Sequence, residues 1–354
     1  MDTSVERGSA DPVRVSSENT PLRVGVLGAG RIGRLHAQLL ADRVPGAVLA
    51  AVHDVIPGPA EELALKFGVR AAGSAQEVLE ADDVDAVAIC TSTDAHVSAI
   101  VAAAAAGKAI LCEKPIALDL AELDRALGAV DAAGVFFQAG FNRRFDPAHQ
   151  SVRDAVVSGA VGEVHLVRIS SRDPAPPPLE YTSRSGGLFL DMTIHDFDMA
   201  RYVTGSEVVE VYARGTVRVV PELAELGDVD TAAVMLVHAN GVITVIDNSR
   251  QAVYGHDQRV EAFGSGGMAA SENPPVHTGI VRTRTGTQGP PLPYFFLERY
   301  LQSYVREWEA FVHALRERLP SPVSGLDGRA PLAIGLAAQR SQREGRPVRV
   351  AEIG

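Results

Sequence analysis

The chain has 354 residues, of which 46% are hydrophobic, and it carries a formal net charge of −11. This length predicts two domains, with ample apolar material for buried cores. The acidic balance argues against nucleic acid as a partner, since it supplies no cationic surface for phosphates, and the absence of a long apolar run argues against a membrane span.

The N-terminus and the cysteines point to a reducing compartment. Residues 1–20 are polar and lack the apolar core of a signal peptide, so we expect a disordered tail. Cys90 and Cys112, the only cysteines, each end an apolar, strand-like run and are expected to be buried free thiols in the cytoplasm. No metal site is expected, because only Asp191 and His195 have ligand spacing.

A dinucleotide-binding motif follows the first predicted strand. The apolar run Leu22 to Leu27 ends in Gly28-Ala29-Gly30-Arg31-Ile32-Gly33 and leads into a predicted helix from Arg34 to Arg43. Glycines let the backbone approach a pyrophosphate, which the amides of the helix N-terminus then bind. The alternative is a glycine turn that binds nothing. The predicted cofactor-binding residues here are Gly28, Gly30, Arg31, Ile32 and Gly33.

A second predicted strand, Val48 to Val52, leads to Asp54, about 20 residues beyond the motif. Its carboxylate would accept hydrogen bonds from the adenosine ribose hydroxyls and would repel a 2′-phosphate. No arginine follows Asp54 directly. We therefore predict NAD as the cofactor in preference to NADP.

Helices and strands alternate through the rest of the first half. Apolar periodicity predicts helices at 61–67, 75–79, 93–106 and 120–132, and strands at 86–89, 109–112 and 135–138. This alternation predicts a doubly wound, parallel Rossmann sheet over residues 21–140. In such sheets, ligands bind beyond the carboxyl ends of the strands.

Two of these strand ends carry candidate cofactor residues. Thr91, Thr93 and His96 follow the strand at 86–89, and the small hydroxyls suit the nicotinamide end of a cofactor. The alternative is that Thr93, or its neighbour, caps a helix. Glu113 and Lys114 follow the strand at 109–112, and the proline after Lys114 restricts the backbone of the lysine.

The third strand end carries Asn142, Arg143 and Arg144 within the run from Gly140 to Asp146. Two arginines at the edge of a cofactor site can hydrogen-bond a polyhydroxylated or anionic substrate. The alternative is that they pair with surface acids.

The run from Ser185 to Arg201 is the strongest candidate for catalysis. It places Asp191 and His195 four residues apart at a predicted helix start, and therefore on one helical face. A neutral imidazole beside a carboxylate can accept a proton. The structural alternative is that Asp191 or Thr193 caps a helix whose first turn is acidic.

The second half predicts a domain in which strands dominate. We expect a helix at 148–158, a strand at 164–170, a stiff proline-rich loop at 173–178, and strands at 208–220, 230–236, 242–248 and 259–263. Asn240-Gly241 predicts a hairpin. Residues 268–293 look irregular, and helices are expected at 296–319, with an aromatic core stripe, and at 330–342. These elements predict an α+β domain with a large, open, mixed or antiparallel sheet.

Four motifs in order resemble those of the Gfo/Idh/MocA oxidoreductases, and most resemble the inositol 2-dehydrogenases: 28–33, 113–115, 140–146 and 191–198. The resemblance runs from about Leu22 to the C-terminus. It implies a Rossmann domain at 21–140 and a substrate domain at 141–325 whose sheet commonly forms homotetramers. It also implies that the C-terminal helix, within 326–354, packs back near the first domain.

The resemblance further implies NAD-dependent oxidation of a secondary ring hydroxyl, such as that of myo-inositol. Lys114 matches the family lysine that contacts the reacting hydroxyl, Asp191 and His195 match its aspartate and histidine near the substrate, and Arg143 matches a substrate-contacting arginine. We expect His195 to take the hydroxyl proton, Lys114 to stabilise the developing alkoxide, and Asp191 to orient His195.

The expected ring recognition involves Asn142, Tyr254 and His256, and many relatives carry a second tyrosine where this chain has His256. One alternative function is the same chemistry on another polyol, such as an aldose, a glycoside, scyllo-inositol or an aminocyclitol. A second is a non-catalytic dinucleotide sensor. The joint presence of Lys114, Asp191 and His195 argues against the sensor.

Overall fold

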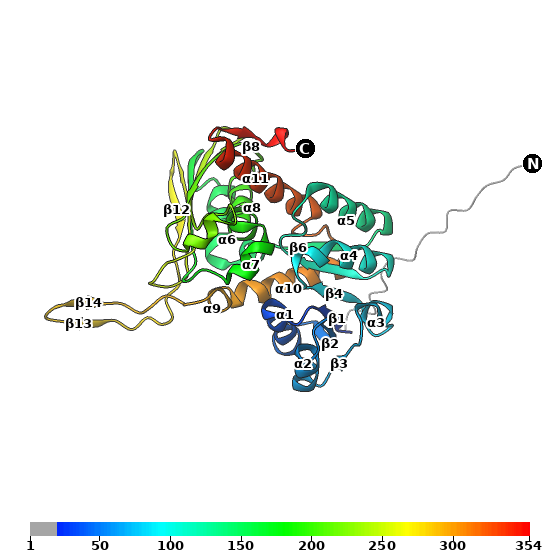
Figure 1. The fold of residues 1–354 in the computed structure, drawn as a ribbon. Helices are drawn as coiled ribbons and strands as arrows, with labels where there is room; N and C mark the ends of the chain where they lie inside the picture. The colour runs from blue at the N-terminus through cyan, green and yellow to red at the C-terminus, as the bar shows by residue number, and fades with distance from the viewer. Residues whose placement is uncertain (1–19) are drawn as a thin grey trace, which may run out of the picture. The chain divides into compact units, whose positions relative to one another are not determined.

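A computed structural model describes residues 20–354 (Figure 1), so the expected tail at 1–20 lies almost entirely outside the described residues. The chain divides into two compact units. Unit 1 holds the described residues up to Ile116, with Ala121–Gly140 and Trp308–Gly325. Unit 2 holds Ala117–Leu120, Phe141–Glu307 and Leu326–Gly354. The domain boundary predicted after Gly140 coincides with a limit of unit 1, whereas residues 308–325 belong to unit 1 and not to the substrate domain.

Unit 1 is built on a six-stranded parallel sheet in the order β3-β2-β1-β4-β5-β6, which confirms the predicted Rossmann fold. Its strands are β1 (Leu22–Leu27), β2 (Ala47–His53), β3 (Arg70–Ala71), β4 (Ala86–Ile89), β5 (Ala109–Glu113) and β6 (Phe137–Gly140). The helices between them are α1 (Arg31–Asp42), α2 (Pro59–Phe67), α3 (Ala75–Glu80), α4 (Thr93–Ala105) and α5 (Leu120–Ala133).

Unit 2 contains a seven-stranded sheet in the order β12-β11-β7-β10-β9-β8-β15, and a separate two-stranded ribbon. Its strands are β7 (Val164–Arg172), β8 (Val208–Thr216), β9 (Thr231–His238), β10 (Ile243–Ser249), β11 (Asp257–Gly264), β12 (Gly267–Ser271), β13 (Val281–Thr283), β14 (Gly286–Gln288) and β15 (Val348–Arg349). Only β7 and β10 pair in parallel within the larger sheet, so the predicted mixed sheet is confirmed. The hairpin predicted at Asn240-Gly241 joins β9 to β10.

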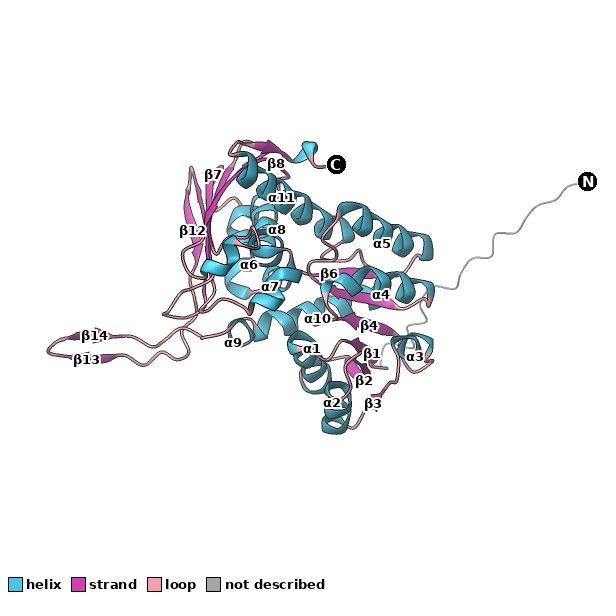
Figure 2. Ribbon diagram, viewed as in Figure 1, coloured by secondary structure: helices cyan, strands magenta, loops and turns pink. Residues whose placement is uncertain are grey.

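Helices cover one face of the larger sheet (Figure 2). They are α6 (Pro147–Val157), α8 (Ile194–Thr204) and α11 (Gly325–Glu344). Apolar residues of α8 and α11, such as Phe197 and Ala337, share one core with Val234 and Leu236 of β9. The period-2 alternation of β9 and β10 points their other side chains outward. The shorter helical elements are α7 (Leu179–Ser185), η1 (Asn142–Phe145), η2 (Leu188–Met192), η3 (Pro221–Ala224) and η4 (Val350–Glu352).

The structure corrects several sequence predictions. The stretch 268–293, expected to be irregular, contains β12, β13 and β14. The helix predicted at 296–319 divides at Tyr300 into α9 (Phe296–Arg299) and α10 (Leu301–Arg316), and its aromatic stripe is buried as predicted. α11 packs into the core of unit 2, and its predicted contact with the first domain stays a prediction. No helix within residues 20–354 is long and apolar enough to cross a membrane.

Candidate active site

The glycine turn of unit 1 is shaped as a phosphate cradle. Gly28 has a φ of 96°, and a Cβ there would lie 2.5 Å from the carbonyl oxygen of Cys90. A Cβ on Gly33 would lie 1.8 Å from the carbonyl oxygen of Gly28, so only glycine fits either position. A Cβ on Gly30 would meet nothing within 4 Å, and Gly30 is the N-cap of α1. The turn is therefore open where the helix amides point, as binding of a pyrophosphate requires.

Asp54 is fixed beside this turn. Its Oδ2 accepts a hydrogen bond of 2.6 Å from the amide of Ala29, and its Oδ1 accepts one of 2.8 Å from the amide of Ile56. Each carboxylate oxygen has a second acceptor position. Asp54 therefore lies beside the glycine motif, and its carboxylate can accept further hydrogen bonds from ribose hydroxyls.

The next strand end differs from the prediction. α4 starts at Thr93 with Ser92 as its N-cap, so neither Thr93 nor its neighbour Asp94 caps the helix. The ring of His96 is buried, and its Nδ1 and Nε2 lie 2.8 and 3.1 Å from the backbone carbonyl oxygens of Pro115 and Thr91. Both ring nitrogens thus face the backbone. His96 ties two loops together, and direct binding of a cofactor by its ring is not supported.

A buried chain of hydrogen bonds ends at the predicted Glu113 and Lys114. The indole nitrogen of Trp308 donates to Nδ1 of His36 over 2.8 Å, so Nε2 of His36 carries the proton that it donates to Glu113 Oε1 over 2.9 Å. Glu113 Oε2 accepts a bond of 3.3 Å from the amide of Lys114. Glu113 therefore holds the backbone of the lysine, and its contact with a cofactor stays a prediction. The sequence analysis missed His36, and it placed Trp308 in the aromatic core stripe without this hydrogen bond.

The arginines at the start of unit 2 are committed to buried acids. Arg143 Nη1 donates to Asp196 Oδ1 over 2.8 Å and to the Ser171 hydroxyl over 3.0 Å, and Asp196 is fully buried. Asn142 donates to the hydroxyl of Ser303. The sequence alternative of surface partners is wrong, since the acids are internal. Substrate contact by Arg143 stays a prediction.

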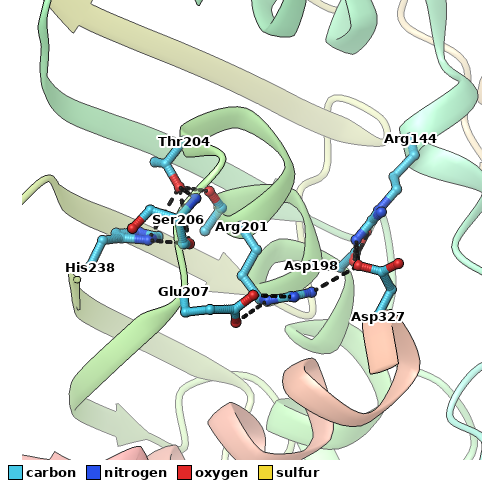
Figure 3. A network of polar contacts seen from close by, with 9 residues as sticks. Arg144, Asp198, Arg201, Thr204, Ser206, Glu207, His238 and Asp327 are labelled. Carbon is cyan, nitrogen blue, oxygen red and sulfur yellow. Dashed lines mark hydrogen bonds and ion pairs between the residues drawn. The ribbon is translucent and has the colours of Figure 1, made fainter. Parts of the chain in front are cut away.

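Arg144 belongs to a second network, shown in Figure 3. It donates to Asp198 over 2.6 Å and to Asp327 over 3.0 Å, and Arg201 also contacts Asp327. Arg201 binds Glu207 at 2.6 Å as well. These bonds connect η1 with the middle and the last turn of α8 and with the first turn of α11. Arg144 therefore has a structural role, because its loss would leave the buried Asp198 without its charge partner.

Asp191 and His195 do not share one regular α-helix as predicted. Asp191 lies in the π-type turn η2, in which the Thr193 amide bonds to the Leu188 carbonyl five residues back, and α8 starts only at Ile194. No side chain caps α8. The hydroxyl of Thr193 donates instead to Asn248 Oδ1 over 2.8 Å. Thr193 thus occupies the N-cap position of α8 without a capping hydrogen bond from its side chain, and the alternative that Asp191 caps this helix is wrong.

Within the run from Leu188 to Ala200, His195 alone reaches the surface. Every other residue of this run is buried, including Asp191. The His195 ring packs edge-on against Phe141, with their centroids 5.9 Å apart. A buried framework thus presents one partly exposed imidazole, which is the arrangement that a general base needs.

The carboxylate of Asp191 is held by two residues that the sequence analysis missed. The hydroxyl of Tyr181 donates to its Oδ1 over 2.9 Å, and Arg250 Nη2 donates to its Oδ2 over 3.0 Å. Arg250 is buried and also contacts Asp173, at 3.3 Å. Arg250 directly follows β10, so its place at a strand end was a signal that sequence reasoning could have used.

The predicted ring-binding residues Tyr254 and His256 differ in their surroundings. The hydroxyl of half-exposed Tyr254 donates to Asp257 over 2.7 Å and accepts from Arg172. His256 is buried, and neither of its ring nitrogens has a hydrogen-bond partner among residues 20–354. Burial, aided by the positive charge of Arg143, lowers the pKa of His256 to about 3. Its ring is therefore neutral and able to donate one hydrogen bond and accept another.

Buried neutral histidines predict a loss of stability in acid. Burial also lowers the pKa of His149 to about 3, whereas an unfolded histidine titrates at about 6.5. The unfolded chain therefore binds more protons between these values, and the free energy of unfolding should fall as pH drops from about 6.5 towards 3. At pH 5 each buried histidine with a pKa of about 3 lowers the free energy of unfolding by about 2 kcal/mol.

Urea denaturation at pH 7 and pH 5 checks this prediction. His149→Gln should make unfolding less pH-dependent by about 2 kcal/mol over that interval. His165 on the exposed part of β7 provides the matched control, and His165→Gln should leave the dependence unchanged. Equal pH dependence in wild type and His149→Gln would contradict the assignment.

Two family models match the chain. A model described as an oxidoreductase family with an NAD-binding Rossmann fold matches residues 22–141. A model described as the GFO/IDH/MocA C-terminal domain matches residues 149–270. The first match covers the glycine motif, Asp54 and Lys114, and the second covers Asp191, His195 and His256.

The chain is also similar to inositol dehydrogenases along almost its whole length. It is 46% identical to the myo-inositol 2-dehydrogenase of Thermotoga maritima, over 94% of this chain and 99% of that protein. A crystal structure of a probable dehydrogenase from Thermotoga maritima matches with a TM-score of 0.92, 46% identity, and coverage of 94% of this chain and 100% of that one. The scyllo-inositol dehydrogenase of Lactobacillus casei, solved with NAD(H) and scyllo-inositol, matches with a TM-score of 0.88, 30% identity, and coverage of 94% and 100%.

Proposed function

Because this chain belongs to the Gfo/Idh/MocA family of oxidoreductases, we propose that it oxidises a secondary ring hydroxyl of a cyclitol with NAD, converting myo-inositol to its 2-keto product. The observation that carries the proposal is that His195 is the one residue between Leu188 and Ala200 that is not buried. The inositol dehydrogenases among its relatives support the substrate class. The open glycine turn with Asp54 supports the cofactor.

In this mechanism His195 accepts the proton of the reacting hydroxyl, and Lys114 stabilises the negative charge that develops on the oxygen. Asp191 binds a neighbouring hydroxyl and orients His195, and Arg250 and Tyr181 keep its carboxylate in place. The nicotinamide, when bound, supplies the acceptor for the two electrons and the hydrogen of the carbon. Protonation of His195 in acid removes the base, so oxidation requires the neutral ring.

His256 is proposed to bind a ring hydroxyl of the substrate, since its buried nitrogens have no hydrogen-bond partner among the described residues and the nearest acid, Asp173, lies 3.6 Å from Nδ1. His256→Phe should raise KM for the polyol by about 10- to 100-fold, equivalent to about 1–3 kcal/mol. KM for NAD should stay within about twofold. Tyr254→Phe provides the comparison, because its hydroxyl is already committed to Asp257 and Arg172 and its loss should matter less. Steady-state kinetics distinguish the two variants.

Asp54 is proposed to select NAD over NADP. Asp54→Ser should raise KM for NAD by about tenfold or more, because hydrogen bonds of a charged group are lost, and should improve use of NADP by removing charge repulsion. The matched control is Asp131→Ser on the exposed face of α5, which should change neither value. An unchanged ratio of kcat/KM for the two cofactors in Asp54→Ser would contradict this role.

The proposed function is tested by following NADH absorbance while a panel of polyols is offered with NAD and then NADP. The panel contains myo-inositol, scyllo-inositol, an aldose, a glycoside and an aminocyclitol. The highest kcat/KM on myo-inositol with NAD supports the proposal. A higher kcat/KM on another member would identify that polyol as the substrate. Tight binding of NADH without turnover of any member would identify the protein as a dinucleotide sensor.

The proposal also includes the oligomeric state of the protein and its location in the cell. We propose a homotetramer formed through the outer face of the larger sheet, which exposes the apolar side chains of Val209, Met235, Ile243, Val245 and Phe263. A cytoplasmic location is supported by Cys90 and Cys112, which are buried free thiols.

A further inference from the structure

Asp173 and His256 face each other at one end of the larger sheet. Strands β7 and β11 pair antiparallel, with Arg172 opposite Asp257. Asp173 follows β7 and His256 precedes β11, so they form the next opposed pair beyond the ladder. The Oδ1 atom of Asp173 lies 3.6 Å from Nδ1 of His256. The mechanism described above leaves this acid without a role.

The backbone and the carboxylate of Asp173 are both held in place. Its amide donates to the carbonyl of Ser249 over 2.9 Å, and its carbonyl accepts from the amide of Ala252 over 2.7 Å. Its Oδ2 accepts a hydrogen bond of 3.3 Å from Nη1 of Arg250. The carboxylate therefore keeps one oxygen on Arg250 and presents the other to His256.

The position of His256 is fixed as well. Its amide donates to the carbonyl of Pro293 over 2.9 Å. Its ring is buried and packs edge-on against Tyr300, with the ring centroids 5.9 Å apart. The ring and the carboxylate of Asp173 therefore meet in one defined arrangement.

The imidazole of His256 has a single proton to place. Burial lowers its pKa to about 3, so at neutral pH one ring nitrogen donates and the other accepts. Burial raises the pKa of Asp173, but the guanidinium of Arg250 opposes this rise and solvent still reaches 24% of the side chain, so the acid is ionised. A lone pair on Nδ1 would be repelled by this carboxylate, whereas an N–H there is attracted to it. The carboxylate thus favours the proton on Nδ1.

We propose that Asp173 is a positioning residue that fixes this tautomer of His256, so that Nε2 accepts a hydrogen bond from a hydroxyl of the bound polyol. The inference rests on the proposed binding of a ring hydroxyl by His256. It gives this contact a specificity, because only a group that carries a proton can donate to a lone pair. A fluorine or a keto oxygen at the same carbon places an acceptor against the lone pair and is rejected.

The position of the proton can be measured without any turnover. In protein that carries nitrogen-15 histidine, proton–nitrogen correlation spectra distinguish a protonated ring nitrogen from one with a lone pair. The signals of His256 are those that disappear in His256→Phe. In the wild type Nδ1 should be protonated. In Asp173→Asn the amide oxygen stays on Arg250 and the amide nitrogen donates to Nδ1, so the proton should move to Nε2.

Inositols with one hydroxyl replaced by fluorine test the specificity, since fluorine cannot donate a hydrogen bond. The ring position that faces His256 is the one at which this replacement loses its effect in His256→Phe. There the wild type should have at least tenfold lower kcat/KM for the fluoro analogue than for the parent. In Asp173→Asn this penalty should fall at least threefold, because the N–H on Nε2 can approach fluorine. Asp83→Asn, at an exposed acid that pairs with Arg70, should keep the wild-type penalty.

The double variant separates positioning from structural support. If Asp173 acts through His256, then Asp173→Asn should not change the fluorine penalty in the His256→Phe background. If Asp173 only supports Arg250, Asp173→Asn should lower kcat equally for the parent and the fluoro analogues in both backgrounds, which would overturn the proposal. A proton on Nε2 of His256 in the wild type, or an unchanged tautomer in Asp173→Asn, would also overturn it. Absence of turnover on every polyol would contradict the proposed function, and the spectra would still decide the tautomer.

Discussion

Replacing His195 by glutamine should lower kcat for polyol oxidation by about 100- to 10,000-fold, the range that removal of a general base produces. Glutamine keeps a polar side chain at the one partly exposed position of the run from Leu188 to Ala200. The buried framework of η2 and α8 should therefore persist, and the dissociation constant of NADH should stay within about twofold. His165→Gln, at an exposed site on β7, should have wild-type kinetics.

The pH profile separates a base from a merely structural histidine. A protonated imidazole cannot accept the hydroxyl proton, so kcat/KM of the wild type should fall in mildly acidic solution as His195 becomes protonated. His149 and His256 have pKa values lowered to about 3 and stay neutral there, so they do not produce this limb. In His195→Gln the limb should vanish. Near-normal turnover in this variant, or an acid limb that survives in it, would contradict the role of His195.

Much of unit 1 was predictable because its signals are local. Strands β1 and β4 have the predicted bounds, since each is an apolar run that ends in glycine or polar residues. The glycine motif predicts a tight turn, then a helix, and then an acid about 20 residues later, and the structure has these features in that order, with Asp54 as the acid. β3 was missed because two residues leave no period in the sequence. Its strand character comes from parallel pairing with β2, which local pattern does not contain.

In unit 2 the sequence predictions failed where the bonding partner of a residue lies far away along the chain. The sequence indicated that Arg143 and Asp191 are functional residues but not which side chains hold them. Arg143 pairs with Asp196 across 53 positions, and Asp191 with Arg250 across 59. The first pair joins η1 to α8, and the second joins η2 to the residue after β10, so no local pattern contains either pair. Likewise, β12 gains its character from β11, so its weak apolar pattern looked irregular.

Replacing Lys114 by methionine should lower kcat by about 100- to 1,000-fold, because the charge developing on the substrate oxygen loses its positive partner. Methionine has similar length and no charge, so binding of NADH should change by less than about threefold. Lys66→Met, at an exposed position of α2, is the matched control and should keep the wild-type rate. Stopped-flow absorbance of NADH formation measures the chemical step separately from product release.

Lys114→Arg separates charge from position. The guanidinium keeps the positive charge but is larger and planar, so it does not replace a compact ammonium at one oxygen. The backbone of Lys114 is fixed by the buried chain Trp308, His36 and Glu113, and the side chain therefore starts from one defined point. We expect Lys114→Arg to recover less than a tenth of the lost rate. Full recovery would mean that only net charge matters, and an unchanged kcat in Lys114→Met would assign stabilisation of the alkoxide to another group.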